Sequence, residues 1–118
     1  MATFTKAHLS GAADGLAVKV VQTATAGTTI HTATASTDAG VFDEIWIWAV
    51  NSSASAVKLT IEWGEATAPD GNIEVTIPPE SGLQQVVPGL ILHNAKVVKA
   101  FASVANVVVL HGFVNSIA

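Results

Sequence analysis

Apolar and polar side chains alternate along much of the chain, and this alternation predicts short β-strands. From residue 57 to residue 63 every odd position is apolar and every even position is polar, which is the period of a strand with one face in the core and one in solvent. The preceding stretch, 45–50, is apolar on both faces and predicts a strand covered on both sides. Because the link 51–55 is polar turn chemistry, we expect residues 42–63 to form a central hairpin.

Similar stretches follow one another along the rest of the chain, with turn formers about every 8 to 12 residues. Residues 96–104 also fit a helical stripe, but their dense β-branching favours a strand. The pattern predicts an all-β fold, an antiparallel β-sandwich of the jelly-roll type with eight to nine short strands. The further predicted strands are 16–21, 28–35, 73–77, 83–87, 90–92, 96–104 and 107–114.

The first 14 residues are predicted to form an N-terminal arm, and residues 15–118 a single β-sandwich domain. Phe4, Lys6, His8 and Leu9 are interspersed with small residues, and turn formers follow at 10–15. A chain of 118 residues fits one domain with a real core. The arm could pair as an edge strand or reach onto a partner, and the sequence leaves both alternatives open.

The charge of the chain argues against a nucleic-acid partner. There are five lysines, no arginine and nine acidic residues, for a formal net charge of −4, so no basic face can form to neutralise phosphates. Only 12% of the residues are charged while 50% are hydrophobic, which indicates apolar surface that is hidden by oligomerisation or by docking on a larger body.

Two further absences in the sequence set expectations about stabilisation and location. Cysteine is absent, so disulfides and thiolate metal sites cannot contribute. No apolar run reaches the ~20 residues of a membrane helix, and the N-terminus lacks the charged start and apolar block of a signal peptide. We therefore expect a soluble protein with no membrane partner and no signal peptide.

Catalytic and metal-binding arrangements find no support in the sequence. A metal-binding cupin places two histidines one residue apart on a strand, whereas His31 is followed by Thr32 and Ala33. Asp43 and Glu44 are adjacent in an extended segment, so they point to opposite faces and cannot cooperate as a carboxylate pair. The sequence predicts no enzyme, no metal and no cofactor. The histidines considered are His8, His31, His93 and His111.

The three tryptophans have two interpretations. Trp46 and Trp48 share one face of a predicted strand, and exposed rings there could stack on sugars. The chain has no tyrosine and no arginine, which usually accompany such recognition surfaces. Packing in the core or at a subunit interface is therefore the preferred role of Trp46, Trp48 and Trp63.

Five segments share a pattern of strands, turns and small residues, with no catalytic signature: 42–53, 59–64, 73–78, 87–90 and 109–114. Together they resemble the small β-sandwich head proteins of tailed bacteriophages, the proteins that decorate or cement the capsid. The likeness spans roughly residues 15–117.

This resemblance implies a structural virion protein that binds the major capsid protein lattice and stabilises the shell. It implies a homotrimer on the capsid exterior, made in the host cytoplasm during assembly, with Phe4, Lys6, His8 and Leu9 in a docking arm. The alternative is a carbohydrate- or host-binding β-sandwich module of a phage tail or spike.

Overall fold

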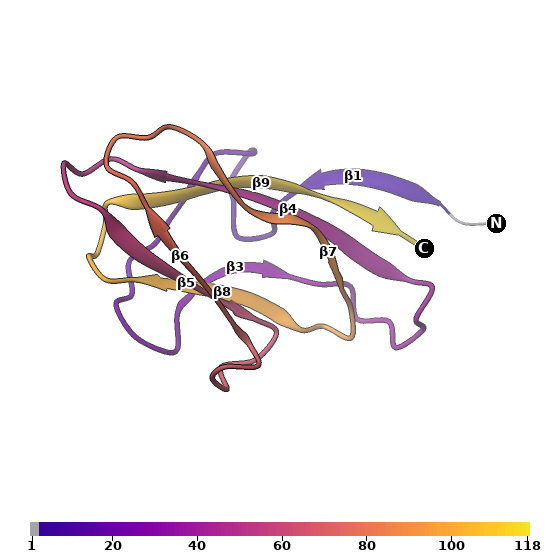
Figure 1. The fold of residues 1–118 in the computed structure, drawn as a ribbon. Coiled ribbons are helices and arrows are strands. Elements are labelled where there is room, and N and C mark those ends of the chain that lie inside the picture. Colours follow the sequence, from indigo (N-terminus) through magenta and orange to yellow (C-terminus); the bar gives the residue numbers. More distant parts are fainter. Residues whose placement is uncertain (1–2) are drawn as a thin grey trace.

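The computed structural model describes residues 3–118, which form nine β-strands and no helix. Sheet A has the strand order β1-β9-β4-β7, with β2 pairing on β9 as well, and sheet B has the order β3-β8-β5-β6. The two sheets lie face to face, and every strand pairing is antiparallel (Figure 1). The strands are β1 (Phe4–His8), β2 (Val18–Lys19), β3 (Thr28–Thr32), β4 (Phe42–Asn51), β5 (Val57–Trp63), β6 (Asn72–Ile77), β7 (Gln84–Leu92), β8 (Val97–Ala102) and β9 (Val108–Ile117).

The core fills the space between the sheets and follows the alternation of the sequence. Along β4, the inward side chains Ile45, Ile47 and Ala49 have no exposed area, while the outward ones are half-buried. On the facing sheet, Leu59 and Ile61 of β5 are buried in the same cluster. The prediction of an all-β, antiparallel β-sandwich is confirmed.

The predicted central hairpin is wrong, because its two strands belong to different sheets. β4 pairs with β9 and β7 in sheet A, whereas β5 pairs with β6 and β8 in sheet B. The link between them crosses the sandwich around the buried Asn51, whose amide donates to the carbonyls of Ser55 at 2.8 Å and of Ile77 at 3.1 Å. The polar turn chemistry was interpreted correctly, but it joins the two sheets.

Other predicted strands differ from the observed ones mainly in their limits. The predicted strands 83–87 and 90–92 form one strand, β7, whose register with β4 shifts around Gly89. Residues 96–104 contain the strand β8, and the alternative of a helix is not observed. From 16–21 only Val18 and Lys19 pair in a sheet.

The first described residues pair as an edge strand of sheet A. β1 runs antiparallel to β9, with Phe4 opposite Ile117 and His8 opposite Phe113. Thr3 and Ala118 extend the ladder by two backbone hydrogen bonds, of 2.6 and 2.9 Å, and Figure 1 shows β1 beside the last part of β9. The sequence left open whether the N-terminal arm pairs as an edge strand or reaches onto a partner. Residues 4–8 form the edge strand.

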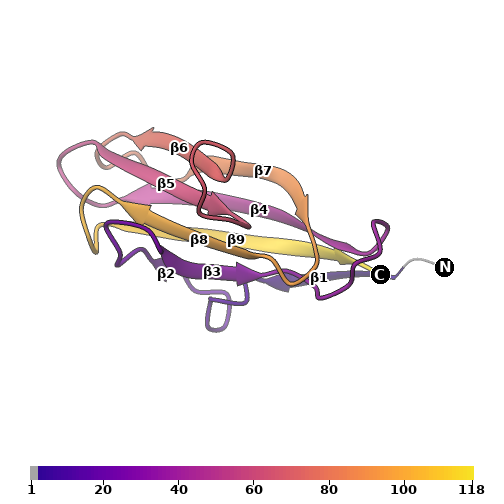
Figure 2. The ribbon, with the colours of Figure 1, turned by 90° about the horizontal axis from the view of Figure 1, so that it is seen from below.

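The strand order determines how the chain passes between the layers. Figure 2 views sheet B from outside, with β6, β5, β8 and β3 side by side in front of sheet A. From β3 onward every step except the one from β5 to β6 crosses to the other sheet. The jelly-roll type expected from the sequence remains a prediction, and this alternation is the feature that favours it. Among residues 3–118 there is no helix that is long and apolar enough to cross a membrane.

Candidate functional site

Three aromatic rings gather on the outer face of sheet A, and we call Trp46, Trp48 and Phe113 the aromatic platform. Trp46 of β4 lies opposite Phe113 of β9 in the register. The ring centroids are 6.4 Å apart for the two tryptophans, 6.2 Å for Trp46 and Phe113, and 5.9 Å for Trp48 and Phe113. The ring planes lie within 28° of parallel, so the rings support one another in a single orientation.

Polar and backbone groups fix the ring of Trp46. Its indole N–H donates to Glu44 Oε1 at 2.7 Å. The backbone of β7 passes against the ring at Gly89, where a Cβ atom would come to 2.7 Å from a ring carbon. Gly89 also has a φ of +78°, a conformation that favours glycine. Glycine at this position therefore allows the indole to lie against the neighbouring strand.

Glu44 is held on the same face as the aromatic platform. Its Oε1 also accepts a hydrogen bond from Asn115 Nδ2 at 3.0 Å. The hydrogen bond from Asn115, and then the one from Trp46, lower the pKa of Glu44 below its usual value, against a smaller opposing effect of burial. Glu44 is therefore ionised at neutral pH beside the aromatic rings.

The predicted docking residues meet this face from β1. Lys6 Nζ lies 4.4 Å from the centroid of the Phe113 ring, within the range of a cation–π contact. Phe4 is 72% exposed, and Leu9 has no exposed area because it packs in the chain's own core. The structure thus places Lys6 against the Phe113 ring of the aromatic platform, and the exposed His8 lies opposite Phe113 in the register. Leu9 does not lie on the surface that could dock.

Trp63 lies apart from the other two tryptophans. It ends β5 in sheet B, on the side that faces the core, and packs half-buried against the core cluster. Trp46 and Trp48 belong to sheet A and point outward. The three predicted interface tryptophans therefore do not form one surface.

The outer face of sheet A is apolar well beyond the aromatic platform. The register places nine large apolar side chains on it, but only three charged ones, Lys6, Lys19 and Glu44. The outward positions of β5 in sheet B are instead Lys58, Thr60 and Glu62. The apolar members of the sheet A face are Phe4, Phe42, Trp46, Trp48, Val50, Ile91, Val109, Phe113 and Ile117.

A buried histidine and a buried aspartate connect the N-terminal segment to both sheets. His31 is 4% exposed and Asp43 is 5% exposed, with 2.7 Å between Nε2 and Oδ2. The backbone N–H of Ser10 donates to His31 Nδ1 at 2.9 Å, so Nε2 carries the proton and donates to Asp43. This enclosed pair holds the segment after β1 in place, and it supports the prediction that Asp43 and Glu44 point to opposite faces.

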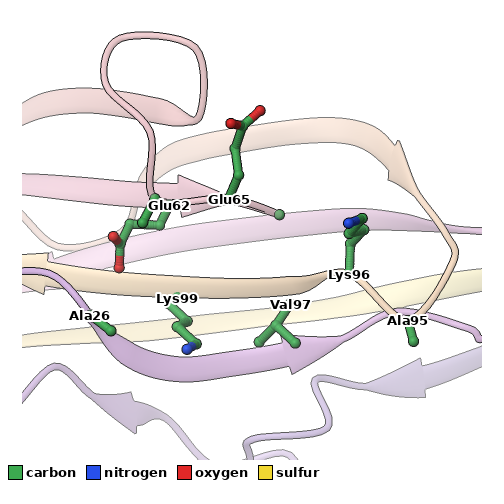
Figure 3. Close-up of a pocket in the computed structure, with 9 residues that line it drawn as sticks. Ala26, Glu62, Glu65, Ala95, Lys96, Val97 and Lys99 are labelled. Carbon is green, nitrogen blue, oxygen red and sulfur yellow. The ribbon is translucent and has the colours of Figure 1, made fainter.

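A pocket of about 270 Å³ lies on sheet B at the ends of β5 and β8. Figure 3 shows Glu62 turned toward Ala26, while Glu65 points away from the sheet. Both carboxylate oxygens of Glu62 accept hydrogen bonds, one from the Thr25 hydroxyl and one from the Gly27 N–H. Glu62 therefore anchors the β2–β3 connection, and its hydrogen bonds give it a structural role in this pocket.

Residues 3–118 contain no group of three or more histidine, cysteine, aspartate or glutamate side chains that could hold a metal ion. No protein family, curated protein or solved structure matches the chain. The assignment of a function therefore depends on the surfaces of this molecule.

Sequence reasoning missed several members of the site. Glu44 lies two residues before Trp46 in an extended segment, so the alternation of side chains already placed both on the same face. Phe113 and Asn115 reach that face only through the β4–β9 register, which joins positions about 70 residues apart. Gly89 follows Pro88 in the break between the predicted strands 83–87 and 90–92, but the sequence did not connect it with Trp46.

Proposed function

We propose that this chain is a structural virion protein that decorates and stabilises the capsid of a tailed bacteriophage by binding the major capsid protein lattice. The observation that carries the proposal is the apolar outer face of sheet A, over which no other strand of the described chain packs. Phe4 and Ile91 are its most exposed members, and the other seven apolar side chains are half-buried. Soluble monomers rarely expose contiguous apolar patches of this kind without a partner. The sequence resemblance to capsid decoration proteins supplies the identity of that partner.

The size of this face suits a stable protein interface. β4 and β9 have 10 residues each, and a face four strands wide and ten residues long covers roughly 600 Å² at the usual strand spacing and rise. A standard interface buries about 800 Å² per partner. The outer face of sheet A, with its rim, provides most of that area on one flat surface.

The proposed activity is mechanical and requires no cofactor. Burial of the sheet A face across neighbouring capsid subunits adds binding free energy to the assembled shell that free subunits lack. Repeated copies on a lattice gain avidity, so a flat surface with few charges is sufficient. The site of action is the capsid exterior, reached from the host cytoplasm during assembly.

We assign Trp46 and Trp48 to the capsid side of the molecule, together with Phe4 and Lys6 of the predicted docking arm. The reason is that all four lie on one continuous face. The homotrimer implied by the resemblance is part of the proposal, and native mass spectrometry of the purified protein tests it. A monomer over the micromolar range would reject the trimer.

The test of the proposed function is binding to heads of the phage that encodes this chain, prepared without the protein. Trp48→Ala removes a ring from the sheet A face, and Phe101→Ala removes a half-buried outward ring from sheet B as a matched control. We expect Trp48→Ala to weaken binding about 30-fold, as for a central aromatic hot spot, and Phe101→Ala to change it less than about twofold. Failure of the unaltered protein to bind, or equal effects of both variants, would reject the proposal.

A glycan-binding tail or spike module is the second candidate, and the near-parallel rings of the aromatic platform favour it. Two tryptophans and a phenylalanine with planes within 28° of parallel could stack on sugar rings, and Glu44 could accept from hydroxyl groups. Tryptophan fluorescence titrated with a panel of oligosaccharides distinguishes the two functions. Saturable quenching that Trp48→Ala abolishes, together with no binding to heads, would establish the glycan function.

A further inference from the structure

One acidic group interrupts the apolar outer face of sheet A. Glu44 is the only acidic side chain that the strands of this sheet carry outward among the described residues. It lies between Phe42 and Trp46 on β4, so any partner that covers the aromatic platform also covers this carboxylate. Burying an ionised carboxylate is costly unless a donor or an opposite charge meets it.

The contacts within the described chain leave one carboxylate oxygen of Glu44 able to accept further hydrogen bonds. The hydrogen bonds from Trp46 and Asn115 both end on Oε1, and no hydrogen bond to Oε2 occurs within residues 3–118. Both donors are neutral groups, an indole and an amide, so they orient the carboxylate without neutralising its charge. Lys6, the nearest cation in the register, is placed over the Phe113 ring.

The aromatic platform already receives one cation from the chain itself. Lys6 Nζ lies 4.4 Å from the Phe113 centroid, which shows that a positive group can sit on these rings. The ring of Trp46, which is hydrogen-bonded to Glu44, is a stronger cation–π acceptor than the ring of a phenylalanine. A carboxylate with a free oxygen next to fixed indole rings is suited to a cation that is both planar and able to donate hydrogen bonds.

We propose that the outer face of sheet A recognises a guanidinium group, an arginine of the capsid protein that pairs with Glu44 and lies against the ring of Trp46. A guanidinium group stacks on aromatic faces and donates in a fixed fork to a carboxylate, whereas an ammonium group is compact and strongly hydrated. The chain contains no arginine, so this group must come from a different protein and not from a second copy. The inference rests on the proposed function.

The absence of arginine from the chain makes a direct test possible. Heads prepared without the protein are treated with an arginine-specific dicarbonyl reagent, and a parallel sample is treated with a lysine-specific acylating reagent. We expect arginine modification to weaken binding of the unaltered protein at least about 30-fold, the lower limit for removing one partner of a buried charge pair. Lysine modification should change it less than about twofold. Electron microscopy verifies that both treatments leave the heads intact.

A pair of variants tests the other side of the contact. Glu44→Gln and Glu65→Gln change the net charge equally, but Glu65 lies exposed on the loop after β5. We expect Glu44→Gln to bind untreated heads at least about 30-fold more weakly and to be insensitive to arginine modification. We expect Glu65→Gln to behave like the unaltered protein. Far-ultraviolet circular dichroism checks that both variants are folded.

The outcomes separate this inference from the proposed function. If the protein binds heads but neither arginine modification nor Glu44→Gln weakens binding, the guanidinium assignment is wrong and the decoration function stands. If lysine modification alone abolishes binding, the cation is an ammonium group and the assignment is also wrong. If the protein binds no heads at all, the proposed function and the inference both fall.

Discussion

Replacement of Gly89 by alanine should destabilise the protein more than replacement of Gly82 by alanine. Both glycines have a positive φ, of +78° at Gly89 and +72° at Gly82. A Cβ atom at Gly82 would meet nothing within 4 Å, whereas one at Gly89 would lie 2.7, 2.9 and 3.1 Å from atoms of the Trp46 ring. The two substitutions therefore share the backbone cost and differ in the contact with the ring.

The size of the difference follows from the contacts of Trp46. The left-handed conformation costs an alanine about 1 to 2 kcal/mol at either position. At Gly89 the indole must also move away from its two aromatic neighbours, Trp48 and Phe113, and each such pair contributes about 0.5 to 1.5 kcal/mol. We expect Gly89→Ala to cost about 1 to 3 kcal/mol more than Gly82→Ala, provided that the ring is held where the structure places it.

Urea unfolding followed by circular dichroism measures both free energies without relying on the tryptophan signal that the substitution perturbs. A Trp46→Ala background supplies a double-mutant cycle, in which Gly89→Ala should cost no more than Gly82→Ala because the ring is gone. Equal costs of the two substitutions in the unaltered background would refute the reasoning. That result would mean that the indole moves aside freely and that the aromatic platform is not a fixed surface.

Three further predictions concern the core, the buried pair and the acidic side chain of the sheet A face. Ile47→Ala should cost about 2 to 5 kcal/mol in urea unfolding because the side chain has no exposed area, and a cost below about 1 kcal/mol would contradict its place in the core. Asp43→Ala leaves the buried Nε2–H of His31 without an acceptor and should cost about 1 to 3 kcal/mol; the exposed control Glu65→Ala should stay within about 0.5 kcal/mol, and similar costs would be inconsistent with the pair. The pKa of Glu44 is lowered from 4.5 by its hydrogen bonds, so its ionised form adds stability at neutral pH that is lost as the pH falls through the lowered pKa. Glu44→Gln should therefore lose less stability than the unaltered protein between about pH 5 and pH 3, and parallel losses in urea unfolding would show that these hydrogen bonds do not favour the ionised form.

The strands were predictable from the sequence because their cause is local. The alternation at 57–63 and the apolar stretch at 45–50 correspond to β5 and to the centre of β4, and the burial of every second residue in β4 follows from the same period. Partnership between strands is not local. A polar link such as 51–55 can close a hairpin or cross between two sheets, and only the packing of both sheets decides which it does.

The candidate site was predictable only in part for the same reason. Trp46 and Trp48 are two residues apart on one strand, so the sequence shows that they share a face. Trp63 is on a different strand, and the sequence could not show that this strand lies in the other sheet. The resemblance placed Leu9 in a docking arm, whereas the turn after β1 directs its side chain into the core. Lys6 approaches Phe113 because β1 pairs with β9, a contact between the two ends of the chain.

The pairing of β1 with β9 also determines how the molecule responds to tension. Thr3 and Ala118 are hydrogen-bonded neighbours, so a force that pulls the two ends apart loads the β1–β9 hydrogen bonds one after another. Such peeling would proceed from Thr3 to His8 and then meet Leu9, which is anchored in the core. We therefore expect β1 to detach first under tension. Further unfolding requires the side chain of Leu9 to leave the core.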